Sequence, residues 1–75
     1  MSEERLRLSR GNHSGFDRYY DIYLGQHCIG FVARRVRGQG LWEGWPMGKS
    51  GQIILGSQRS GVVDLVIQRW NEAHS

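Results

Sequence analysis

Only one stretch of this sequence, residues 57–73, shows clear helical periodicity. Apolar residues recur there at the spacing of a single helix face, and the Ser57 hydroxyl can accept a hydrogen bond from the first free backbone N–H groups. The predicted face consists of Val62, Leu65, Val66, Arg69, Trp70 and Ala73, of which Arg69 alone is charged. We therefore expect a C-terminal helix around which the rest of the chain packs.

The residues before this helix have the pattern of short strands separated by glycine-rich turns. The predicted strands are residues 16–24, 28–37, 41–45 and 53–55. A tight turn at Gly25-Gln26-His27 would pair the first two of them antiparallel. Residues 28–37 carry apolar side chains on both faces, which is typical of a central strand. The expected fold is α+β, with a small antiparallel sheet of three to five strands packed against one C-terminal α-helix.

Side-chain alternation assigns residues to the two faces of the sheet. Along residues 16–24, one face holds Tyr20, Ile22 and Leu24, and the other holds Tyr19, Asp21 and Tyr23. Residues 5–10 also alternate, with Leu6 and Leu8 on one face and the arginines on the other. This segment, which lies within residues 1–10, is predicted to form either a first strand or a flexible basic arm.

Two details of the predicted helix bear on its packing. Gly61 costs about 1 kcal/mol relative to alanine inside a helix, and it would permit close packing on the sheet. Val63 and Ile67 flank the main apolar face. They either cover the edge of the sheet or form a self-association surface, and the first alternative is favoured.

Composition places the chain in the class of small intracellular proteins. Residues 1–75 form one domain, and a chain of this size buries only about 60% of the surface that it exposes when unfolded. Its single cysteine, Cys28, excludes an internal disulfide, which suits a reducing compartment. No apolar run reaches the about 20 residues that span a bilayer, and the charged start is unlike a signal peptide. We expect a soluble, cytoplasmic protein that does not enter the membrane.

The sequence offers little support for enzymatic chemistry. Residues 44–50 (GWPMGKS) resemble a phosphate-binding loop, but three residues separate the glycines instead of four, and no helix follows. The possible metal ligands His13, His27, Cys28 and His74 lack the spacing of a zinc site. The carboxylates are scattered, and so short a chain has little material for a closed cleft. We expect no enzyme activity, no cofactor and no metal.

Basic and aromatic residues gather on strands that the pattern makes adjacent. The net charge is +3 and the sequence pI about 9.6. The candidate nucleic-acid-binding residues are Arg34, Arg35, Arg37 and Trp42 on the sheet, with Lys49 and Arg59 on phosphates. Arginine contacts phosphates or guanine edges, and rings such as those of Tyr19, Tyr23 and Trp45 stack bases. Two interpretations of this pattern have equal weight. The residues either form a binding platform of this kind, or the rings lie half in the core and the arginines form a solvated strand end.

Two binding functions fit this pattern. The first is a small non-enzymatic module that binds nucleic acid, DNA or RNA, through the basic and aromatic face of the sheet. The second is a protein-interaction or inhibitor module that binds an acidic protein partner through the same surface or through Val63, Ile67 and Trp70. A homodimer formed through the helix is a further alternative. The sign and clustering of charge favour nucleic acid, with DNA first.

The order of elements resembles the AP2 domain and the arm-type DNA-binding domain of phage-type integrases, in which three antiparallel strands precede one helix packed across them. Residues 30–34 (GFVAR) are similar to the second strand of AP2 domains. Residues 55–57 (LGS), followed by residues 62–66 (VVDLV), are similar to the Leu-Gly-Thr start of their helix. Residues 58–61 and 38–52 depart from the family pattern. The resemblance implies a sheet that reads the DNA major groove, here with Arg34, Arg35, Arg37 and Trp42.

Overall fold

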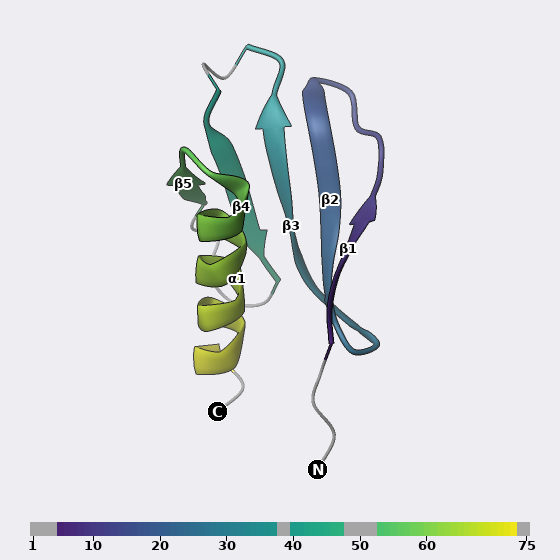
Figure 1. The fold of residues 1–75 in the computed structure, drawn as a ribbon, viewed down its shortest axis with the longest axis vertical. Helices are drawn as coiled ribbons and strands as arrows, with labels where there is room; N and C mark the ends of the chain where they lie inside the picture. The colour runs from purple at the N-terminus through teal and green to yellow at the C-terminus, as the bar shows by residue number, and fades with distance from the viewer. Residues whose placement is uncertain (1–4, 38–39, 48–52, 74–75) are drawn as a thin grey trace.

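The computed structural model describes residues 5–37, 40–47 and 53–73. Five strands and one helix follow one another along the chain (Figure 1): β1 (Leu6–Arg10), β2 (Phe16–Leu24), β3 (His27–Arg35), β4 (Trp42–Pro46), β5 (Ile54–Gly56) and α1 (Arg59–Ala73). Each strand pairs antiparallel with the next one in the sequence. The predicted α+β fold is confirmed: an antiparallel sheet, with β3 as its central strand, packs against one C-terminal helix.

Residues 6–10 form an edge strand rather than a basic arm. The register of β1 on β2 pairs Leu8 with Ile22, Arg10 with Tyr20 and Arg7 with Tyr23. Because side chains alternate along a strand, Arg10 lies on the same face as Leu8, and Arg7 lies on the opposite face. The prediction that the arginines lie opposite the leucines holds for Arg7 and is wrong for Arg10, which is an even number of residues from Leu8.

Helix α1 covers one face of the sheet, called here the helix face, and leaves the other, the open face, uncovered. The helix packs on β3, β4 and β5, so β1 and β2 extend beyond it (Figure 1). The core between helix and sheet consists of Ile22, Leu24, Ile29, Val32, Val62, Val63 and Val66. Tyr20 packs against this core, whereas Tyr19 contacts Phe31 on the open face. The predicted alternation along residues 16–24 is therefore confirmed.

A β-bulge between β2 and β3 changes which side chains reach the core. Ile22 pairs with Gly30 and Tyr23 pairs with Cys28, so Ile29 has no direct partner on β2. The extra residue turns Ile29 toward the helix, where it is fully buried. Simple alternation predicts Ile29 and Phe31 on one face; in the structure Ile29 joins the core and Phe31 lies on the open face.

The apolar side of α1 is rotated relative to the predicted one. It consists of Val62, Val63, Val66, Ile67 and Trp70. Leu65, predicted to belong to it, is 42% exposed, and Arg69 and Ala73 are exposed as well. Leu65 lies on the β5 side of the helix, where it lines a small pocket with Gly56, Ser57 and Gln58. Strand β5 has only three residues, which are too few to cover it.

The close approach of α1 to the sheet depends on sheet glycines. A Cβ atom on Gly44 would lie 2.5 Å from Cγ1 of Val62 and 2.9 Å from Cγ2 of Val66. A Cβ atom on Gly56 would lie 2.8 Å from Cγ2 of Val62. A Cβ atom on Gly61 would meet nothing within 4 Å, so the prediction that Gly61 permits close packing is wrong.

The helix begins later than the predicted cap implies. Arg59 is the first helical residue, and the Gln58 carbonyl accepts a hydrogen bond from the Val62 N–H at 3.2 Å. Gln58, and not Ser57, therefore holds the N-cap position. The first turn has no acidic side chain to complement the helix dipole, and Arg59 stands at its positive end.

Candidate nucleic-acid interface

Four arginines and two aromatic residues gather on the helix face beside the start of α1. These residues, called here the basic cluster, are Arg10, Arg18, Tyr20, Arg34, Trp42 and Arg59. Strand register sets them side by side, with Arg10 opposite Tyr20, Arg18 opposite Arg34, and Arg34 opposite Trp42. The cluster is thus assembled from β1, β2, β3, β4 and α1, so it exists only in the folded chain.

Ring contacts hold guanidinium groups close together in the basic cluster. The Cζ atoms of Arg34 and Arg59 lie 5.5 and 6.0 Å from the centre of the Trp42 ring. Arg59 also lies 4.9 Å from the centre of the Tyr20 ring, and the Tyr20 and Trp42 ring centres are 6.5 Å apart. A cation–π contact contributes about 0.5–1 kcal/mol at an exposed site. The rings therefore position two cations that would otherwise repel each other.

Positive charge exceeds negative charge at this surface. Asp17 Oδ2 accepts a hydrogen bond from Arg34 Nη2 at 2.6 Å. This bond holds the pKa of Asp17 below its usual range, so the carboxylate stays ionised. Asp17 offsets one of the four arginines, and Arg10, Arg18 and Arg59 add three further charges. With the positive end of the helix dipole at Arg59, the cluster is an electropositive surface.

The tyrosines on the two faces are expected to titrate far apart. Hydrogen bonding from Arg18, with the charge of Arg59, lowers the pKa of Tyr20 from its ordinary value of 10.0. Burial, and then the carboxylate of Asp21, raises the pKa of Tyr19 to about 12. A near-ultraviolet titration of tyrosinate should show an early step that Tyr20→Phe removes and a late step that Tyr19→Phe removes.

The raised pKa of Tyr19 predicts how the free energy of unfolding changes at high pH. Tyr19 keeps its proton in the folded chain up to about pH 12 but loses it near pH 10.0 when unfolded. The unfolded state therefore binds fewer protons in this window, and the free energy of unfolding falls as pH rises through it. A titration in which Tyr19 ionises no later than Tyr20 would contradict this placement of the two rings.

The open face carries a row of rings in contact, called here the aromatic row: His13, Tyr19, Phe31 and Trp45. Ring centres are 4.2 Å apart for His13 and Tyr19, 5.1 Å for Tyr19 and Phe31, and 5.6 Å for Phe31 and Trp45. Ala33, which pairs with Tyr19, is fully buried although it does not belong to the core under the helix. The open face thus has an apolar layer of its own.

Charged residues of both signs accompany the aromatic row. Arg35 Nε donates a hydrogen bond to Glu43 Oε2 at 2.6 Å. Arg7 lies over the Tyr23 ring, with its Cζ atom 4.8 Å from the ring centre. Asp21 accepts a hydrogen bond from the Tyr19 hydroxyl at 3.3 Å. The open face therefore differs in charge from the basic cluster on the helix face.

The structure brings together three of the predicted nucleic-acid-binding residues, Arg34, Trp42 and Arg59, in the basic cluster. Arg35 follows Arg34 in the sequence and therefore projects from the opposite face. The other predicted residues are Arg37, in the exposed turn after β3, and Lys49, which lies outside the described residues. The residues to which the AP2 resemblance assigns groove reading thus do not share one face of the sheet.

Sequence reasoning misses Arg10, Arg18 and Tyr20 as members of the cluster. The signal for Arg10 is present in the sequence, because an even spacing from Leu8 places it on the helix face. Arg18 is different, since its position follows a register shift between Phe16 and Arg18 that no local pattern reveals.

The predicted protein-interaction residues on α1 all contact the core, although Ile67 and Trp70 are only partly buried. Val63 is 3% exposed, and Ile67 and Trp70 pack against the buried cluster. This burial agrees with the favoured alternative, in which Val63 and Ile67 cover the sheet. Val63 therefore has no exposed surface that a partner could contact.

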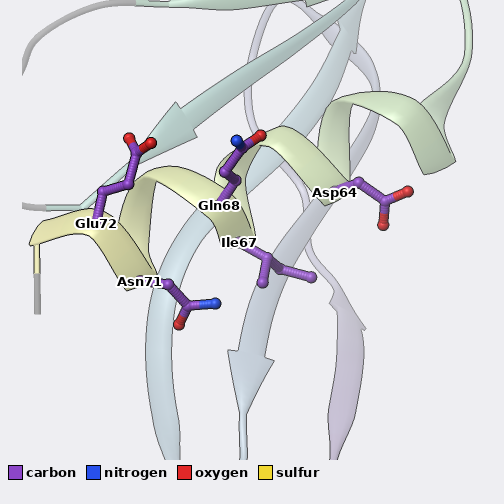
Figure 2. A pocket seen from close by; sticks show the side chains of 5 residues that line it. All are labelled: Asp64, Ile67, Gln68, Asn71 and Glu72. Atoms are coloured by element: carbon purple, nitrogen blue, oxygen red, sulfur yellow. The ribbon is translucent and has the colours of Figure 1, made fainter. Parts of the chain in front are cut away.

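A shallow groove runs along the outer side of α1. It is lined by Asp64, Ile67, Gln68, Asn71 and Glu72. Figure 2 shows that these side chains diverge, with Ile67 and Asn71 on one side of the helix and Gln68 and Glu72 on the other. All five belong to one helix, so the groove does not gather them around a common ligand.

Comparisons with known proteins identify no relative of this chain. No family model matches it, and neither does any curated protein or solved structure. Within residues 5–37, 40–47 and 53–73, no group of three or more His, Cys, Asp and Glu residues is placed to hold a metal ion. No helix in the described part of the chain is both long and apolar enough to cross a membrane.

Proposed function

We propose that this protein binds nucleic acid through the basic cluster, with its guanidinium groups on phosphates. The observation that supports the proposal is the convergence of four arginines, Arg10, Arg18, Arg34 and Arg59, on two rings with Asp17 as the accompanying carboxylate. Like charges held this close repel one another, and an anionic ligand offsets that repulsion. A nucleic-acid backbone presents regularly spaced anions, which suits a surface built from several strands.

The cluster is suited to the backbone rather than to base sequence. Arg34 and Arg59 both lie over Trp42, so this ring serves as a positioning residue for phosphate-binding groups. Phosphate contacts fix the orientation of a protein but carry no direct sequence information. Binding should therefore tolerate any base sequence and weaken steeply as salt rises.

A matched pair of variants on β1 tests the proposal. Arg10 belongs to the basic cluster and Arg7 to the open face, so the two share a strand and a charge but not a surface. Binding would be measured by fluorescence anisotropy with short labelled duplex DNA, single-stranded DNA and RNA, at low and moderate salt. Arg10→Gln should weaken binding several-fold and reduce the slope of log affinity against log salt by about one, whereas Arg7→Gln should leave the slope unchanged.

Two outcomes would reject the proposal. One is the absence of binding to all three nucleic acids at low salt, and the other is an equal change of slope in both variants. A protein complex that survives nuclease treatment and is lost in Arg10→Gln would instead assign the basic cluster to an acidic protein partner.

Removing the carboxylate beside the cluster is expected to strengthen binding. Asp17→Asn releases Arg34 from its ion pair and leaves the surface more positive. Since exposed ion pairs are weak, affinity for duplex DNA should rise by only a few-fold. Asp64→Asn is the control, because it changes net charge equally on the outer side of α1. Equal gains in the two variants would show that net charge, not the cluster, sets the affinity.

A further inference from the structure

The aromatic row is unusual for a solvated sheet face. An antiparallel sheet with one open face normally turns its polar residues toward water. Here Tyr19, Phe31 and Trp45 are only half-buried, and Leu55, which pairs with Glu43 at the margin of this face, is 61% exposed. Apolar patches that remain open on a small domain mark interaction sites.

Charge on the open face favours a second copy of the chain over a polyanion. Arg7 on β1, Asp21 on β2, Arg35 on β3 and Glu43 on β4 alternate in sign across the sheet. These four charges cancel one another, whereas positive charge dominates the basic cluster. An interface between two identical chains related by a two-fold axis must be self-complementary. A face that holds charges of both signs can meet that requirement.

Two polar atoms of the open face also lack partners in the single chain. Glu43 Oε1 and Trp45 Nε1 are buried with no hydrogen-bond partner among the described residues. Buried polar atoms of this kind are rare and costly. One atom accepts and the other donates, so this pair is self-complementary as well.

We propose that two copies of this chain pack open face to open face, as a two-sheet sandwich with both helices on the outside. The two sheets would lie about 10 Å apart. The two longer dimensions of the chain are 42 and 22 Å. The area of a face with these dimensions is of the same order as the area of about 800 Å² that each partner buries in a standard interface. The basic clusters then face outward on both sides, and the dimer does not depend on their ligand.

Charge reversal at Arg7, with the same change at Arg10 as control, tests the dimer. Arg7→Glu gives the open face an excess of negative charge in both copies, whereas Arg10→Glu alters the helix face. Sedimentation equilibrium of the full chain should give twice the chain mass of 8.6 kDa for the unaltered protein and for Arg10→Glu. For Arg7→Glu, the dissociation constant of the dimer should rise about tenfold or more, because like charges then meet at the interface.

A measurement on the unaltered protein makes the test independent of how the variants fold. On dilution, NMR signals of the Tyr19, Phe31 and Trp45 rings should shift, and those of Leu65 on α1 should not. A mass of 8.6 kDa at millimolar concentration would overturn the proposal, and so would equal effects of the two charge reversals. Ring shifts caused by single-stranded DNA in a monomeric protein would also overturn it and would assign the open face to nucleic acid.

Discussion

Replacing Arg34 and Arg59 together with glutamine is expected to lower the affinity for duplex DNA about a hundredfold. Both guanidinium groups lie over Trp42, no more than 6.0 Å from its ring centre, so they act at one place on the surface. A hydrogen bond to a charged group contributes about 1.5–3 kcal/mol, and about 1.4 kcal/mol is a factor of ten. Two lost phosphate contacts should also reduce the salt slope by nearly two, as measured by anisotropy.

The control for this pair is Arg5→Gln with Arg69→Gln, which removes the same charge elsewhere. Both residues are exposed, and Arg69 lies about 15 Å from Arg59 along the helix axis. Circular dichroism would confirm that both double variants remain folded. If the control weakened binding as much as the loss of Arg34 and Arg59, the interaction would be diffuse attraction and the basic cluster would not be its site.

Gly44→Ala is expected to destabilise the protein by about 1–3 kcal/mol, as overpacking of a core does. The added methyl would lie 2.5 Å from Cγ1 of Val62 and 2.9 Å from Cγ2 of Val66, so α1 must move away from β4. For a chain of this size, such a loss is a large part of the total stability. Urea unfolding followed by tryptophan fluorescence should show a lower midpoint with an unchanged m value.

Gly61→Ala is the matched control for the change at Gly44. It adds the same methyl group to α1, where nothing beyond the neighbouring turns of the helix backbone lies within 4 Å of the new position. Alanine is favoured over glycine inside a helix by about 1 kcal/mol, so this variant should be more stable than the unaltered protein. Opposite signs are therefore expected, and destabilisation by both changes would contradict the close approach of α1 to Gly44.

The elements of the fold could be predicted because their signals lie within short segments. Strand β2 has the predicted bounds, since aromatic alternation and the turn at residues 25–27 are both local patterns. The strand that precedes the helix and the helix itself lie within two residues of their predicted positions. The sheet order follows in turn, because each strand pairs with the next one in the sequence.

The faces of the candidate site could not be predicted so well, because they depend on contacts that are distant in the sequence. The bulge at Ile29 shifts alternation within β3, so Ile29 and Phe31 end on opposite faces although they are two residues apart. Gly44 and Gly56, which lie outside the helix, let Val62 and Val66 approach the sheet, and Val63 rather than Leu65 enters the core. The apolar pattern of the helix alone is compatible with either Val63 or Leu65 in the core.

The strand order, in which each strand pairs with the next one in the sequence, has a consequence for the chain during its synthesis. Strands β1 to β4 can pair as soon as they have been made, since each contacts its neighbour in the sequence and the entropy of closing short loops is small. The apolar side of this sheet, with Ile22 and Val32, is covered only when the 15 residues of α1 arrive. A nascent chain that has emerged as far as β4 therefore resembles an aggregation-prone folding intermediate. How fast translation supplies the helix then decides how long that intermediate persists.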